Sequence, residues 1–67
     1  MAATRYAYTA VAPGRDPESF TSNVEYLPGD ELPLRSARLT VVRVEEAGTE
    51  YSEGEVSIAR VLHCRGK

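Results

Sequence analysis

The sequence predicts a small all-β domain, and three observations lead to that prediction. Residues with high strand propensity, above all valine, threonine and tyrosine, fill the segments between turns. Turn signals built on proline or glycine recur at residues 13–14, 28–29, 48 and 54. No segment carries apolar residues at helical spacing. The 67 residues form one domain, and five or six short strands in such a chain are typical of an antiparallel barrel or a β roll.

The N-terminal part contains two predicted strands separated by a loop. Residues 4–11 combine tyrosine, threonine and valine and form the first strand. Two prolines and a glycine within residues 13–17 exclude regular structure there. Residues 19–26 alternate between apolar and polar side chains, which predicts a strand of an antiparallel sheet with one covered face.

The strongest turn signal is Pro28-Gly29. Proline sets φ for the first corner of a type II turn, and glycine accepts the positive φ of the second corner. Large apolar residues stand on both sides of this dipeptide, so one strand enters the turn and another leaves it. The strand that leaves, at 32–34, contains Pro33 and is expected to be short or to lie at an edge.

Residues 38–46 have the highest strand propensity of the chain. They carry apolar side chains on both faces, which predicts a central strand. Gly48 is expected to close a hairpin, followed by a short strand at 49–52 and a second turn at Glu53-Gly54.

The last predicted strand covers residues 55–64. Arg60 interrupts its apolar face, so we expect a bulge near Ala59-Arg60 that restores the alternation. The ordered domain should extend from about residue 4 to residue 64, with a frayed tail at 65–67. The predicted core consists of Phe20, Val24, Leu32, Val42, Val44, Val56 and Ile58.

Two stretches of the first half resemble SH3-like barrels. Residues 5–8 (RYAY) stand where SH3 domains have an aromatic first strand, and residues 24–32 (VEYLPGDEL) resemble their diverging turn, Phe-x-x-Gly-Asp-x-Leu. The resemblance covers about residues 5–34 and implies a small barrel; similar turns occur in PUA-like RNA-binding domains. SH3 domains grip proline-rich peptides with tryptophan, which this chain lacks, so the resemblance concerns the fold and not that ligand.

The single cysteine and single histidine exclude two common ways of stabilising a small domain. The chain cannot form an intrachain disulfide, and it lacks the four Cys or His ligands of a structural zinc site. A lone cysteine favours a reducing compartment, and we find neither a signal peptide nor an apolar run of about 20 residues. We expect a cytoplasmic protein with no cofactor, no metal and no membrane contact.

His63 and Cys64 are the pair that suggests nucleophilic catalysis. Neighbouring residues of a strand point to opposite faces, so base and nucleophile would not meet. We therefore expect no enzyme and no small-molecule substrate. A group of glutamates near Gly48 lacks the spacing of a calcium loop and is expected to face water. These glutamates are Glu45, Glu46, Glu50, Glu53 and Glu55.

Arginines and tyrosines are the candidates for binding a partner. The net charge of −2 is too small to imply a partner by itself. Arginines on neighbouring strands could form a basic stripe that, with exposed tyrosines, would suit single-stranded nucleic acid. Alternatively, they pair with glutamates across strands. The candidate partner-binding residues are Tyr6, Tyr8, Arg35, Arg38, Arg43, Tyr51 and Arg60.

Association with a protein is the function that we favour. A sheet of this size can exclude water from one strand face more easily than from two, and segments 39–44 and 56–62 are apolar on both faces. Leu39, Val41, Ala59 and Val61 are the candidate association face, because exposed apolar patches mark interaction sites. The sequence predicts a non-catalytic binding module with a protein partner or a second copy of itself; a nucleic-acid-binding barrel is the alternative.

Overall fold

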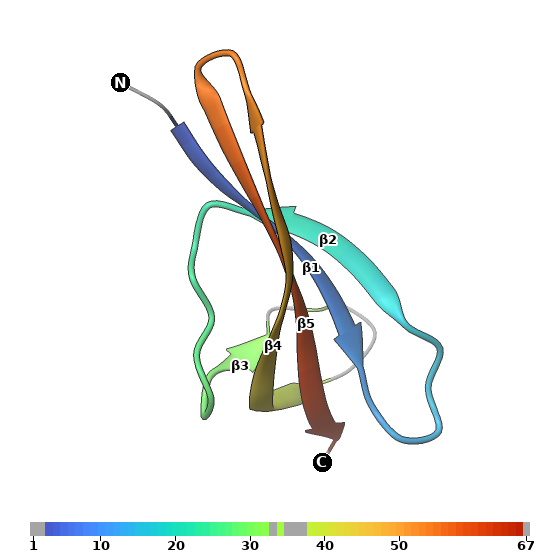
Figure 1. Ribbon diagram of the computed structural model, residues 1–67. Helices are drawn as coiled ribbons and strands as arrows, with labels where there is room; N and C mark the ends of the chain where they lie inside the picture. Colours follow the sequence, from blue (N-terminus) through green and yellow to red (C-terminus); the bar gives the residue numbers. More distant parts are fainter. Residues whose placement is uncertain (1–2, 33, 35–37, 67) are drawn as a thin grey trace.

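The computed structural model describes residues 3–32, 34 and 38–66, which form five strands. The strands are β1 (Ala3–Val11), β2 (Glu18–Ser22), β3 (Glu31–Leu32), β4 (Leu39–Ser52) and β5 (Glu55–Gly66). They make one sheet in the order β2-β1-β5-β4-β3 (Figure 1). The prediction of an all-β domain is confirmed.

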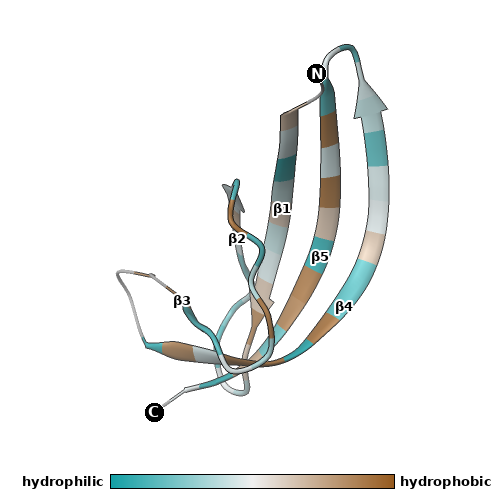
Figure 2. Ribbon diagram, turned by 90° about the vertical axis from the view of Figure 1, so that its left-hand side faces the viewer, coloured by the Kyte–Doolittle hydropathy of each residue, from teal (hydrophilic) through white to brown (hydrophobic). Residues whose placement is uncertain are grey.

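The sheet is mixed, which differs from the antiparallel barrel that the sequence predicts. β1 and β5 run parallel, whereas the other three strand pairs are antiparallel. A parallel pair joins strands that are far apart in sequence, so turn signals do not reveal it. The described strands curl into a half-barrel that stays open, with β2 at one edge and β3 at the other (Figure 2).

The two longest strands, β4 and β5, form one hairpin. Its turn lies at Glu53-Gly54, where Gly54 has a φ of 74°, so the second expected turn is confirmed. Gly48 does not close a hairpin; it lies inside β4 with a φ of 124°. A bulge uses the positive φ of glycine without reversing the chain, and this possibility was missed from the sequence.

The bulge expected on β5 lies on the facing strand instead. The register shifts between the pairs Glu46↔Arg60 and Gly48↔Ala59, which leaves Ala47 as the extra residue of β4. β5 continues through Gly66, which pairs with Leu39, where a frayed tail was expected from residue 65.

The Pro28-Gly29 turn has the positive φ that its sequence predicts, because Gly29 has a φ of 98°. The Asp30 N–H donates to the Leu27 carbonyl at 3.0 Å and closes the turn. The turn is also fixed to β4. The Gly29 N–H donates to the Val41 carbonyl, and the Val41 N–H donates to the Asp30 carbonyl, both at 2.8 Å. This contact keeps the short β3 beside the start of β4.

The two faces of the sheet have different surroundings. The inner face carries Tyr8 and Leu62 and is crossed by residues 23–30, which we call the crossing segment (Figure 2). The outer face carries Thr9 and Val61, which pair with each other and follow and precede the inward-pointing Tyr8 and Leu62 in sequence. The core lies on the inner side and consists of Tyr8, Ala10, Leu32, Leu39, Val41, Leu62 and Cys64.

The predicted core is wrong for most of its members. Only Leu32 belongs to the buried cluster, while Phe20 and Val44 pack at its margin. Val24 and Val42 are exposed, at 51% and 56%. Val56 and Ile58 are half-buried and lie outside the cluster, beyond its end on β5.

The path of the backbone explains the errors at Val24 and Val42. Val42 is the extra residue where the register shifts between Val41 and Arg43, so the inward positions change from Leu39 and Val41 to Val44. β2 ends at Ser22, so Val24 belongs to the crossing segment and not to a strand. The alternation in the sequence therefore predicts the wrong side for both valines.

Candidate functional site

Tyr8 ties the crossing segment to the sheet. Its hydroxyl donates to the Val24 carbonyl at 2.8 Å and accepts the Tyr26 N–H at 2.9 Å. Its ring stacks on Tyr6, with centroids 5.7 Å apart, and contacts the rings of Phe20 and Tyr26. Burial raises the pKa of the Tyr8 phenol. Since Tyr8 is only 1% exposed, this candidate is a core residue and is not available to a partner.

Arg60 holds the crossing segment at a second point. Its Nη1 lies 2.7 Å from Glu25 Oε2, and its Nε lies 3.0 Å from Glu46 Oε1. The guanidinium carbon lies 5.1 Å from the centre of the Tyr6 ring, a cation–π distance. The Glu25 carboxylate, followed by that of Glu46, raises the pKa of Arg60. Arg60, which interrupts the apolar face of β5, thus pairs with glutamates and does not contribute to a basic stripe.

Arg43 does not join Arg60 in a basic stripe. Arg43 lies on the outer face beside His63, and its Nη1 is 3.9 Å from Glu45. Arg38 is exposed just before β4. Arg35 lies outside the described residues. Arg43 and Arg60 are therefore on opposite faces of the sheet.

The part of the hairpin beyond the core is exposed along β4 and half-buried along β5, which pairs with β1 there. We call it the arm: residues 45–58, formed by the outer part of β4, the turn and the start of β5. Residues 45–54 are all exposed, and Tyr51 is 79% exposed. The arm projects away from the crossing segment and gives the molecule a length of 39 Å against a width of 18 Å (Figure 1). Of the candidate tyrosines, Tyr51 is the one best placed to meet a partner.

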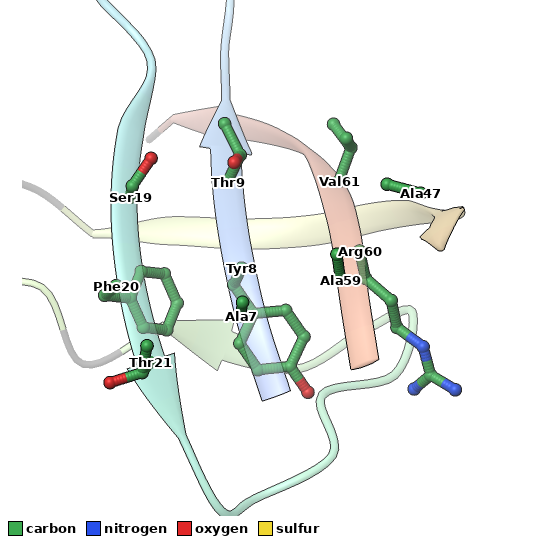
Figure 3. Close-up of a pocket in the computed structure, with 10 residues that line it drawn as sticks. All are labelled: Ala7, Tyr8, Thr9, Ser19, Phe20, Thr21, Ala47, Ala59, Arg60 and Val61. Atoms are coloured by element: carbon green, nitrogen blue, oxygen red, sulfur yellow. The ribbon is translucent and has the colours of Figure 1, made fainter. Parts of the chain in front are cut away.

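The candidate association residues do not share one face. Leu39 and Val41 lie in the core, at 3% and 1% exposed. Ala59 and Val61 lie on the outer face, where they line a shallow pocket with Thr9, Ser19 and Ala47 (Figure 3). The four residues therefore cannot form the single exposed patch that the sequence suggested.

His63 and Cys64 point to opposite faces, as predicted from their adjacency on a strand. His63 Nε2 lies 2.8 Å from Glu45 Oε1, and this hydrogen bond lowers the pKa of Glu45. The Cys64 thiol is buried and donates to the Leu62 carbonyl at 3.4 Å, and burial raises its pKa. Burial therefore favours the neutral form of the thiol, and His63 lies on the opposite face of the sheet.

The glutamates of the arm differ in their contacts. Glu45 bonds to His63, Glu46 to Arg60, and Glu55 lies 3.6 Å from Arg5. No ion pair joins Glu50 or Glu53 to another described residue. Within residues 3–32, 34 and 38–66, no three His, Cys, Asp or Glu side chains are grouped so as to hold a metal ion.

Two further exposed residues could not be recognised from the sequence. Val42 is exposed because of the bulge, and Leu27 is 55% exposed on the crossing segment. Neither position differs in residue type from a core position, so only the backbone path identifies them. In the described part of the chain, no helix is long and apolar enough to cross a bilayer.

Comparisons with known proteins identify no relative. No protein-family model matches this chain, and no curated protein or solved structure shows significant similarity to it.

Proposed function

We propose that this chain is a non-catalytic protein-binding module whose contact surface includes the arm. The observation that carries the proposal is the exposure of the arm, where a long hairpin projects beyond the core and presents Tyr51. Tyrosine supplies a large contact area and a polar group, and it is enriched in interfaces. A domain that needed only stability would gain little from this uncovered extension.

The SH3-like resemblance and the cytoplasmic location belong to the same proposal. A small curved sheet held together by loops is a scaffold that many unrelated binding modules use. The burial of the single cysteine, Cys64, is compatible with the cytoplasm that we propose.

The arrangement of side chains favours a protein over nucleic acid as the partner. Arg60 is engaged by two glutamates, and Arg43 lies on the other face next to Glu45. Tyr8, which would have to stack on a base, is buried. The homodimer through Leu39 and Val41 is not part of the proposal because these residues fill the core.

Site-specific photo-crosslinking tests the proposal. A benzoyl-phenylalanine at Tyr51, expressed in the cells from which the chain comes, should give a discrete adduct with one protein. The same probe at the exposed Asp16, in the loop between β1 and β2, is the matched control and should not give that adduct. Adducts that disappear with nuclease would support the nucleic-acid alternative. Absence of any discrete adduct from probes along the arm and on the outer face would contradict the proposal.

A further inference from the structure

β4 has an open edge along most of its length. β3 pairs with Leu39 and Thr40, and the turn adds the contact to Val41. From residue 42 to residue 52, no described strand lies on the side of β4 that faces away from β5. Such an edge presents unpaired N–H and C=O groups that can accept an additional strand.

The charge of this edge is unbalanced. Residues 42–52 include Glu45, Glu46 and Glu50, and Glu53 follows in the turn, against a single positive charge on Arg43. Glu50 and Glu53 lack an ion-pair partner among the described residues, so their charge is available to an incoming chain. Pairing this edge with the same edge of a second copy would double the excess negative charge, which disfavours self-pairing.

Two exposed side chains stand near the ends of the same edge. Val42 is 56% exposed and Tyr51 is 79% exposed. Tyr51 and Glu50 are neighbours on the strand and point to opposite faces, so an added strand would meet the Tyr51 ring on one face and the Glu50 carboxylate on the other. The bulge at Ala47 divides the edge into two short runs, so an added strand would pair over one or both of them.

We infer that the open edge of β4, residues 42–52, binds an extended, positively charged segment of a partner protein as an added strand. This inference rests on the proposed function and names the chemistry of the partner. Main-chain hydrogen bonds supply the affinity, and lysine or arginine side chains facing Glu50 and Glu53 supply the selectivity. The same glutamates protect the edge from pairing with identical copies.

A peptide titration followed by NMR tests the inference. The probe is a nine-residue peptide that alternates lysine with valine, and the matched control replaces each lysine with glutamate. With the lysine peptide, amide signals of residues 42–52 should shift and their hydrogen exchange should slow, whereas those of the β2 edge at 18–22 should not. The glutamate peptide should have no effect. Equal shifts with both peptides, shifts confined to β2, or no shifts would overturn the inference.

Charge reversal tests whether Glu50 and Glu53 bind the lysine peptide. The variant Glu50→Lys/Glu53→Lys should weaken binding of the lysine peptide by about tenfold or more, since two charge contacts are lost. The control Asp16→Lys/Glu31→Lys makes the same change in net charge on two exposed residues outside the 42–52 edge and should leave the affinity within about twofold. Equal losses in both variants would contradict the inference. If the crosslinking adducts form on the outer face instead of at Tyr51, this inference fails while the proposed binding function stands.

Discussion

The two ends of the β4–β5 hairpin have opposite properties. Near Leu62 and Val41 the sheet is covered by the crossing segment and contains the fully buried side chains of the protein. In the arm, which shares the same two strands, residues 45–54 are all exposed. The covered end carries leucine and valine, whereas residues 45–54 are mostly glutamate, glycine and small residues, so the core lies where apolar side chains and the cover coincide.

Besides the backbone contacts of Gly29 and Asp30 to Val41, two side chains of the sheet hold the crossing segment in place. The Tyr8 hydroxyl satisfies two of its backbone groups, and Arg60 binds Glu25. Tyr8 and Arg60 both lie on the inner face of the sheet. The position of the crossing segment and the packing of the core therefore depend on each other. Four predictions test this contrast between the covered end and the arm.

The largest effect is expected from Leu62→Ala, which removes a side chain with no exposed surface. The substitution should destabilise the fold by about 2–5 kcal/mol, because it deletes buried groups and leaves a cavity. The control is Ile58→Ala, four residues earlier on the same face but in the arm, for which we expect about 1 kcal/mol. Denaturant unfolding measures both, and equal losses would show that the arm is packed as tightly as the covered end.

Tyr8→Phe should produce the next largest effect. It removes the hydroxyl that bonds to Val24 and Tyr26, leaving a donor and an acceptor unsatisfied, at a cost of about 1–3 kcal/mol. The amide of Tyr26 should exchange faster. Tyr51→Phe makes the same chemical change on the exposed arm and should stay within about 0.5 kcal/mol of the wild type. If Tyr8→Phe destabilises the protein no more than Tyr51→Phe does, the Tyr8 hydroxyl does not hold the crossing segment.

The Arg60–Glu25 ion pair should have a smaller effect. The Arg60 side chain is 14% exposed and that of Glu25 is 47% exposed, so solvent screens the pair only in part. A double-mutant cycle with Arg60→Met and Glu25→Gln should give a coupling of about 1 kcal/mol. The more exposed pair Arg5–Glu55 should give about 0.5 kcal/mol or less. A coupling for Arg60–Glu25 no larger than this would mean that the Tyr8 hydroxyl and the backbone contacts to Val41 hold the crossing segment.

The smallest effect concerns pH and Glu45. Its hydrogen bond to His63 lowers its pKa in the folded state, so the stabilisation is present above the unfolded pKa and is lost as pH falls through the folded one. Between about pH 6 and pH 3, the wild type should therefore lose slightly more stability than Glu45→Gln. Glu50→Gln, which removes a glutamate without an ion pair, should follow the wild type. The free energy of unfolding, measured by denaturant titration at each pH, checks this. If it changes with pH in the same way for the wild type and Glu45→Gln, the hydrogen bond to His63 does not contribute to stability.

The local features of this protein could be predicted from its sequence. The all-β class follows from strand propensity, and the positive φ of Gly29 and the Glu53-Gly54 turn follow from glycine at those positions. The opposite orientation of His63 and Cys64 follows from alternation along a strand. Each of these depends on interactions between residues that are close in sequence, so no partner strand had to be known.

Only the tertiary structure decided which side chains are buried and which meet solvent. The parallel pairing of β1 with β5 joins residues about fifty positions apart, and the extra residues Val42 and Ala47 change the inward side of β4. A one-residue shift transfers every later side chain to the other face, so alternation misplaced Val42 and suggested an exposed Val41. Val24 was misplaced because β2 ends at Ser22. The core position of Tyr8, the pairing of Arg60 with Glu25 and the open edge of β4 all depend on segments that meet only when the sheet has curled.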